Sequence, residues 1–320
     1  MSCDPAVADR AAGCQHRHMS SSESTISNAV IEEITRRVLV ELIGESARLD
    51  DRSIPDPQKV HWSAEAKAIK REIVQVGRKL WQRSYVDGNG GNISARISDN
   101  YLICTPTLLS KADLTEDDLC LVDMDNRQKV GHRPQTSEML LHLEIYKANP
   151  KARAVVHCHP PHATAYAMAG IVPPVGYIPE FEVFVGPVGL TKYETPGTKA
   201  FAESVVPFVK NHNTILLANH GIVCWSDTVT HAEWCVEVLD TYCHTLAVAR
   251  QLGAPLNQIP EQKLRDLLRV KRRLGLPDPR LAMLRDDEPE ELKSAGMAPD
   301  DFDELVRAIA DQVSQTLDLE

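Results

Sequence analysis

The 320-residue chain has few of the features that mark membrane, secreted or nucleotide-binding proteins. No apolar run approaches the ~20 residues that a membrane-spanning helix needs. The first residues lack the basic and then apolar stretches of a secretory signal. The glycine-dense segment 87–94 matches neither the GxGxxG nor the GxxxxGK(S/T) pattern of nucleotide-binding loops. These absences predict a cytoplasmic protein without a membrane partner, and they give no sign of a nucleotide site.

The chain also has fewer basic than acidic residues. Lys and Arg number 35 against 45 Asp and Glu, which gives a net charge of −10. A field of this sign repels nucleic acid and anionic lipid, so neither is expected as a partner. A phosphorylated substrate would need a locally positive pocket built from a metal ion, backbone N–H groups or a helix N-terminus. The eight cysteines include no CxxC pair and are expected to be reduced thiols.

The hydrophobic content of 43% suits one folded domain with additional segments at both ends. Apolar residues recur every four positions between Ile26 and Leu42, which is typical of an amphipathic helix, and a similar stripe runs from Leu305 to Leu317. We expect a disordered tail 1–25, an amphipathic helix 26–44, a linker 45–60, a folded domain 61–253, a proline-broken extension 254–300 and an amphipathic helix 301–320.

Short β-type runs alternate with helical ones between residues 62 and 252. Neighbouring runs are typical of hairpins rather than of a repeating parallel βαβ series, so the pattern predicts an α/β fold. The expected strands are 91–97, 101–104, 154–159, 176–184, 186–191, 214–219 and 221–225. The expected helices are 62–83, 137–147, 162–169, 198–210 and 228–252.

Two histidines one residue apart, His157 and His159, end an apolar run. Alternate side chains of a strand lie on the same face, so both imidazoles could bind a single ion. His220 ends another apolar run and could complete a three-histidine site with an open position, which is the geometry of a catalytic metal. The alternative for a bare His-x-His pair is that the two rings make only local hydrogen bonds.

Three further motifs carry candidate polar groups. Glu138 follows Thr136 and Ser137 at a predicted helix start, where the two hydroxyls can act as caps. The glycine-dense turn 87–94 can present backbone N–H groups to a phosphate, or it can be an ordinary hairpin turn. Residues 105–107, Thr-Pro-Thr, add hydroxyls after the next strand and are also common in plain turns.

Taken in order, these motifs resemble the class II aldolase/adducin family, and within it the L-fuculose-phosphate aldolases most. The resemblance covers about residues 62–252 and implies a three-layer catalytic domain with a central, mainly antiparallel sheet flanked by helices. The motifs that carry it are Gly90-Gly91-Asn92-x-Ser94, Thr105-Pro106-Thr107, Thr136-Ser137-Glu138, His157-x-His159 and Asn219-His220-Gly221.

The resemblance implies one zinc ion per subunit, bound by His157, His159 and His220. Glu138 matches the family carboxylate that ligates zinc at rest and moves a proton once substrate is bound. Tyr177 aligns with a tyrosine that reaches a neighbouring subunit's active site and protonates the aldehyde oxygen, although a core tyrosine would give the same sequence. The residues that match the phosphate cradle are Gly91, Asn92, Thr107, Thr136 and Ser137.

The implied reaction is cleavage of a deoxyketose 1-phosphate, L-fuculose or L-rhamnulose 1-phosphate, to dihydroxyacetone phosphate and L-lactaldehyde. Glu138 favours an aldolase because the 4-epimerase branch of the family carries Asp there. A pentulose-phosphate 4-epimerase and a sugar-acid phosphate decarboxylase remain as alternatives on the same scaffold. A non-enzymatic, adducin-like interaction module would have lost the metal ligands, all of which are present here.

Two leucines and two lysines bear on the predicted phosphate-binding residues. Leu108 and Leu109 stand where the family often has glycine after Thr-Pro-Thr, which puts part of the cradle in doubt. No Schiff-base lysine is required by a metal-dependent reaction. Lys111 and Lys192 are therefore interpreted either as solvated charges or as charges that steer the phosphate.

The resemblance also implies a homotetramer, but it leaves the two end helices unexplained. The helix 26–44 either packs on its own core or a neighbouring subunit, or it is an encapsulation peptide that binds the shell or cargo of a bacterial microcompartment. The second hypothesis places the enzyme inside a microcompartment for fucose and rhamnose breakdown, where reactive lactaldehyde is sequestered. The helix 301–320 is expected to have a structural role.

Overall fold

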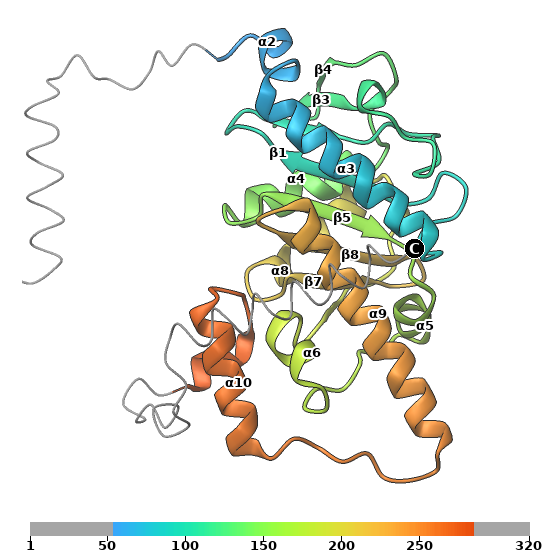
Figure 1. The fold of residues 1–320 in the computed structure, drawn as a ribbon, viewed down its shortest axis with the longest axis vertical. Coiled ribbons are helices and arrows are strands. Elements are labelled where there is room, and N and C mark those ends of the chain that lie inside the picture. The colour runs from blue at the N-terminus through green and yellow to red at the C-terminus, as the bar shows by residue number, and fades with distance from the viewer. Residues whose placement is uncertain (1–53, 285–320) are drawn as a thin grey trace, which may run out of the picture. The chain divides into compact units, whose positions relative to one another are not determined.

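The computed structural model describes residues 54–284 (Figure 1). The expected tail 1–25 and the helices 26–44 and 301–320 lie outside the described residues. The predicted linker 45–60 is described only from residue 54, and its end is helical, since α2 spans Pro57–His61. Pro57 stands at the first position of this helix, where its missing N–H costs nothing, and Asp56 accepts from the N–H of Gln58 as the cap.

An eight-stranded sheet forms the centre of the described chain, in the order β4-β3-β2-β1-β5-β8-β7-β6. Every pair of neighbours is antiparallel except β6 and β7, which are parallel. The predicted α/β fold with a mainly antiparallel sheet is thus confirmed. The strands are β1 Asn92–Arg96, β2 Tyr101–Cys104, β3 Cys120–Asp123, β4 Gln128–Val130, β5 Ala154–Cys158, β6 Gly189–Leu190, β7 Thr214–Leu217 and β8 Gly221–Ser226.

Helices cover both faces of this sheet, so the central strands are buried on both sides. Along β5, Ala154 and Val156 belong to one apolar cluster and Val155 to the other, as the alternation of a strand requires. The first cluster includes residues of α3 Ala64–Gln82, α5 Pro161–Ala169 and α9 Val229–Gln251. The second includes residues of α4 Met139–Ala148, α7 Lys199–Glu203 and α8 Val206–Val209.

Several expected elements differ from the structure. The predicted strand 176–184 is wrong, because Pro179 opens a short helix, α6 Pro179–Phe184, and the predicted strand 186–191 is reduced to Gly189–Leu190. The single helix expected over 198–210 is two short helices, α7 and α8, with Pro207 near the start of the second. The short strands β3 and β4 were not expected at all, and β4 is largely exposed.

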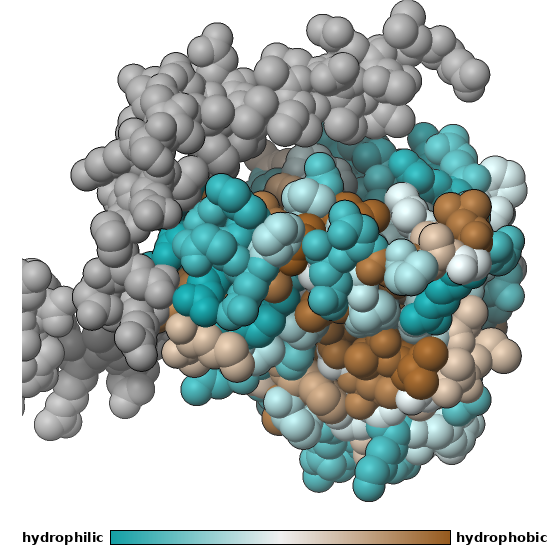
Figure 2. Space-filling view, turned by 90° about the horizontal axis from the view of Figure 1, so that it is seen from below, coloured by the Kyte–Doolittle hydropathy of each residue, from teal (hydrophilic) through white to brown (hydrophobic). Residues whose placement is uncertain are grey.

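Residues 54–284 form no helix that is long and apolar enough to cross a membrane. Apolar side chains nevertheless gather on the face seen in Figure 2.

The six cysteines of the described part are free and buried: Cys104, Cys120, Cys158, Cys224, Cys235 and Cys243. They pack in the interior as small side chains, and Sγ of Cys120 also donates to the carbonyl of Arg133 at 3.2 Å.

The extension after Gly253 is more regular than its prolines suggest. Prolines bracket rather than break a 13-residue helix, α10 Glu261–Arg273, since Pro260 precedes its first turn. A 3-10 turn, Pro279–Met283, follows it. The described part of the predicted extension 254–300 is therefore a structured segment that packs on the domain, beside α6.

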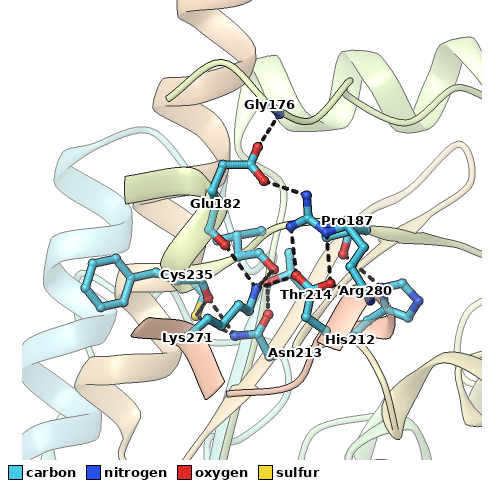
Figure 3. A network of polar contacts seen from close by, with 12 residues as sticks. Gly176, Glu182, Pro187, His212, Asn213, Thr214, Cys235, Lys271 and Arg280 are labelled. Atoms are coloured by element: carbon cyan, nitrogen blue, oxygen red, sulfur yellow. Dashed lines mark hydrogen bonds and ion pairs between the residues drawn. The ribbon is translucent and has the colours of Figure 1, made fainter. Parts of the chain in front are cut away.

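A buried ion network fastens this extension to α6 (Figure 3). Arg280 Nη1 lies 2.7 Å from Glu182 Oε2, and Arg280 Nη2 lies 2.8 Å from Asp278 Oδ2. Lys271 Nζ lies 3.1 Å from the same oxygen of Asp278 and donates to the carbonyl of Val185. Because Glu182, Lys271 and Asp278 are buried, the loss of one partner would leave an uncompensated charge in the interior.

A buried carboxyl group lies between α3 and α9. Glu233 on α9 is fully buried, and neither of its carboxylate oxygens has a hydrogen-bond partner. Lys79 of α3 comes only to 3.8 Å from Glu233 Oε2. Burial, with a smaller effect of the neighbouring Glu237, raises the pKa of Glu233 to about 8. The folded protein therefore keeps a proton that the unfolded chain loses at lower pH.

This raised pKa makes stability depend on pH. The contribution of Glu233 is fully present below the ordinary carboxyl pKa of 4.5 and is lost as the pH rises through about 8. Glu233→Gln removes the titration, so the variant should lose less unfolding free energy than the wild type between about pH 5 and about pH 9. One pKa unit corresponds to about 1.4 kcal/mol, so the difference amounts to a few kcal/mol. Urea unfolding of metal-free protein measures it.

Glu65→Gln serves as the matched control for this experiment. Glu65 lies exposed in the first turn of α3, so the substitution makes the same change of charge without touching the buried site. This control should keep the pH dependence of the wild type. Identical pH dependence in Glu233→Gln and the wild type would contradict the assignment.

Candidate active site

Strand β5 places the first two histidines. It lies between β1 and β8, with His157 opposite Asn92 on one side and Val223 on the other. His159 follows the strand by one residue, and its N–H donates to the carbonyl of Tyr85 at 2.7 Å. The rings of His157 and His159 are 5.0 Å apart, and their Nε2 atoms are 3.2 Å apart. The two rings therefore share one side of the sheet, as the spacing predicts.

His220 reaches the same point from the turn between β7 and β8. Its ring lies 4.7 Å from that of His157 and 5.0 Å from that of His159. The next residue, Gly221, allows this approach, because a Cβ there would lie 2.5 Å from the carbonyl oxygen of Cys158 and 2.6 Å from the His159 ring. One ring nitrogen from each of the three histidines lies within 4.8 Å of the others. The predicted trio is brought together.

The protonation states of His157 and His220 suit a metal ion. The Nδ1 atom of His157 donates to the carbonyl of Ile222 at 2.8 Å, so its Nε2 lone pair faces the cluster. Burial, and then the neighbouring histidines, holds the pKa of His157 well below its usual value. Burial also lowers the pKa of His220, whose Nδ1 atom is buried without a hydrogen-bond partner. Neutral imidazoles packed this closely are the donor set of a divalent cation.

Glu138 lies against two of these rings. Its Oε2 atom is 3.2 Å from Nε2 of His157, and its Oε1 atom is 3.7 Å from Nε2 of His220. Asn92 holds the carboxylate from the other side, donating from Nδ2 to Oε2 at 2.8 Å. Glu138 itself is the N-cap residue of α4 and makes no side-chain cap; of the two expected capping hydroxyls, that of Thr136 accepts from the N–H of Glu138 at 3.3 Å. The carboxylate completes a three-histidine, one-carboxylate set.

A cavity of about 130 Å³ opens beside this set. Nine of the ten predicted site residues line it; the exception is Tyr177. Those nine are Gly91, Asn92, Thr107, Thr136, Ser137, Glu138, His157, His159 and His220. Asn89, Gly90 and Pro106 also line the cavity and were missed, although they lie in the same two turns that the sequence analysis singled out. Polar groups of the two turns thus face the histidines across one small space.

The cavity wall requires glycine at one position of the first turn. Gly91 has a φ of 69°, and a Cβ there would lie 2.6 Å from Val86 and 2.8 Å from the carbonyl oxygen of His157. A side chain would therefore push the turn away from the end of β5.

Leu108 adopts a backbone conformation that glycine favours. Its φ is 56°, in the left-handed region, and its side chain is 79% exposed. The departure from the family pattern therefore leaves the turn after Thr107 with the conformation that glycine favours, at a cost in strain of about 1–2 kcal/mol. The leucine is thus compatible with a glycine-like backbone in this turn.

Tyr177 and the two lysines have other surroundings. Tyr177 is partly buried against the apolar core and does not line the cavity, so its part in a neighbouring subunit's site stays a prediction. Lys192 is exposed. Lys111 is not solvated but buried, and its Nζ donates to the carbonyls of Leu109 and Asn89, one on each turn of the cavity. Burial lowers the pKa of Lys111 to about 8.

Comparison with known proteins agrees with this geometry. The family profile described as class II aldolase and adducin N-terminal domain matches residues 71–247, more than half of the chain. An L-fuculose phosphate aldolase of Methanococcus vannielii is 36% identical over 170 residues, which are 53% of this chain and 91% of the relative. A 3-oxo-tetronate 4-phosphate decarboxylase of Haemophilus influenzae is 34% identical over 160 residues, 49% of this chain and 76% of the relative.

A solved L-fuculose 1-phosphate aldolase structure has the same fold, with a TM-score of 0.58 at 23% identity over 65% of this chain and 97% of that chain. The chain belongs to the class II aldolase and adducin family. It is a lyase of this family, whose aldolases are metal-dependent, and the three histidines fit such a metal.

The metal assignment predicts a stoichiometry. Protein loaded with Zn²⁺ and dialysed should retain about one ion per chain, and His157→Ala should lose most of it because two histidines and a carboxylate bind more weakly. Elemental analysis of the purified proteins measures this. His231→Ala is the control, since His231 is 45% exposed and its ring pairs with Asp227. Full metal content in both His157→Ala and His159→Ala would refute the site.

Proposed function

We propose that the chain is a zinc-dependent aldolase that cleaves a deoxyketose 1-phosphate, L-fuculose or L-rhamnulose 1-phosphate, to dihydroxyacetone phosphate and L-lactaldehyde. The position of Glu138 carries the proposal, because its carboxylate lies against two of the three histidines and lines the same cavity as the phosphate-cradle residues. An acidic group beside a metal site and a phosphate pocket is what proton transfer in such a cleavage requires.

The cradle is assigned to Gly91, Asn92, Thr107, Thr136 and Ser137. These residues offer amide and hydroxyl donors rather than cationic side chains, which suits a phosphate bound near a metal ion in a chain of negative net charge. Binding energy from the phosphate orients the reacting end of the sugar, which does not itself touch the cradle. The small cavity leaves little room for misplacement.

Cleavage of the C3–C4 bond needs two proton transfers. The C4 hydroxyl loses a proton as C4 becomes the aldehyde, and C3 gains one as dihydroxyacetone phosphate forms. We assign the transfer at C3 to Glu138, and the contact with the aldehyde oxygen to Tyr177 of a neighbouring subunit. Zinc, when bound by the three histidines, would supply Lewis-acid stabilisation of negative charge on the substrate oxygens. The hydrogen bond from Asn92 holds the Glu138 carboxylate beside His157.

Zinc and the homotetramer are parts of this proposal. Three imidazoles and a carboxylate are the nitrogen and oxygen ligands that zinc takes in catalytic sites. The apolar face in Figure 2 supports an assembly of several copies, because contiguous apolar patches are characteristic of protein interfaces.

A decarboxylase acting on a sugar-acid phosphate is the second candidate. The relative named 3-oxo-tetronate 4-phosphate decarboxylase favours it, since it is about as similar to this chain as the aldolase relative is. Both reactions break a carbon–carbon bond next to a carbonyl, so the same metal and carboxylate serve either.

The products separate these candidates. Zinc-loaded protein is incubated with L-fuculose 1-phosphate, L-rhamnulose 1-phosphate, a pentulose 5-phosphate and a 3-oxo-tetronate 4-phosphate, and lactaldehyde, epimer and carbon dioxide are measured. We expect lactaldehyde from a deoxyketose phosphate. Glu138→Gln should lower kcat by about 10²–10⁴-fold because the proton donor is lost.

Glu144→Gln, on the same helix, should leave kcat unchanged, since Glu144 pairs with Lys147 and does not line the cavity. Release of carbon dioxide, or of an epimer, in place of lactaldehyde would overturn the aldolase assignment.

Microcompartment association is proposed for the segment 26–44 on its apolar four-residue repeat alone. Deletion of residues 1–50 should abolish co-purification of the enzyme with shell proteins while its activity persists. Unchanged co-purification of the shortened chain would refute the encapsulation role.

A further inference from the structure

A chain of buried polar side chains runs behind Glu138, on the side away from the histidine trio. Asn92 donates from Nδ2 to Glu138 at 2.8 Å, and its Oδ1 lies 2.5 Å from Nε2 of His142. Nδ1 of His142 lies 2.7 Å from the hydroxyl of Ser94, which in turn lies 2.8 Å from the hydroxyl of Tyr146. His142, Ser94 and Tyr146 are buried and do not line the cavity.

Helix and strand periodicity produce this chain. Glu138, His142 and Tyr146 are spaced by four residues at the start and along one face of α4. Asn92 and Ser94 are two residues apart in β1 and lie on one face of that strand. The two faces meet, so each group from the helix alternates with one from the strand.

Only one arrangement of hydrogens satisfies the whole chain. A carboxylate only accepts, so Asn92 must turn its amide nitrogen to Glu138 and its oxygen to His142. That oxygen also only accepts, so Nε2 of His142 carries the ring proton and Nδ1 accepts from Ser94. Burial lowers the pKa of His142 to about 3, so the ring is neutral and has one N–H to give. Because Ser94 gives its one hydroxyl hydrogen to His142, the hydroxyl hydrogen of Tyr146 completes the order, shared between Oγ of Ser94 at 2.8 Å and the carbonyl oxygen of Ser94 at 3.0 Å.

We propose that His142 is a positioning residue: by donating to Asn92 from Nε2, it fixes the orientation of the Asn92 amide and thereby the carboxylate of Glu138 against the metal-binding histidines. Without this donor, the amide of Asn92 can rotate and turn its oxygen towards the carboxylate, which repels it. One of the two N–H groups of Asn92 is committed to Glu138. The other is then the sole donor that this side chain can offer a substrate phosphate, so the same amide links the two halves of the site.

The test uses the full chain and measures zinc affinity as well as turnover. His142→Leu keeps an apolar volume but removes the donor, and it should weaken zinc binding by about 10–100-fold in competition with a chelator, with a similar fall in kcat. KM should rise only modestly, because Asn92 is one of the five cradle residues and the other four are intact. His142→Gln restores an N–H donor near the position of Nε2 and should recover most of the zinc affinity.

Ile145→Ala is the matched control. Ile145 is fully buried on the same helix but belongs to the apolar cluster, so its truncation loosens α4 without removing a hydrogen bond. It should lower the unfolding temperature and leave zinc affinity unchanged. If His142→Leu does not fold, Ser94→Ala still tests the chain, since loss of its hydroxyl leaves Nδ1 of His142 unpaired and frees the ring to change tautomer.

The inference rests on the proposed role of Glu138, and the outcomes separate the two. Unchanged zinc affinity and kcat in Glu138→Gln would refute the role of the carboxylate itself. A strong effect of Glu138→Gln with wild-type zinc affinity in His142→Leu would refute the positioning role alone. Equal losses in His142→Gln and His142→Leu would also refute it, because the donor would then not be what matters.

Discussion

The site depends on the pairing of β5 with β1 on one side and β8 on the other. This pairing puts His157 between two strands and brings the start of β8, preceded by His220, beside the end of β5. These strands are buried on both faces, so a slip of one residue would move each side chain into the other apolar cluster, where the packing does not match it. The geometry of the histidines is therefore set by the hydrophobic packing of the sheet.

Burial has a second effect at the same place, because it keeps the imidazoles uncharged. Desolvation is the largest cause of the lowered pKa values of His142, His157 and His220. Neutral rings offer lone pairs to a cation, and they give the hydrogen-bond chain behind Glu138 a single direction. Packing thus determines both where the ligands lie and which protonation state they hold.

The positions of the histidines and most of the residues around the cavity could be predicted from the sequence. The strand period alone places His157 and His159 on one side, and the order of motifs was enough to identify the family and most of the cavity wall. The role of His142 could not be predicted, because its partner Asn92 is 50 residues away and only the contact between α4 and β1 joins them. The strand β4 was missed because its three residues are mostly polar and exposed. The segment 176–184 has no clear period, and Pro179 decides in favour of a helix.

The ion network in the C-terminal extension bears on where this enzyme ends. The family profile matches residues 71–247, yet Glu182 inside that range is neutralised by Arg280 outside it. A protein trimmed to those residues would lose both Arg280, the counterion of Glu182, and α10, which packs on α6. The family match and the buried ion pairs therefore place the C-terminal boundary of the folded domain at different residues. A stable shortened protein has to include α10 and the turn Pro279–Met283, although both lie outside the family match.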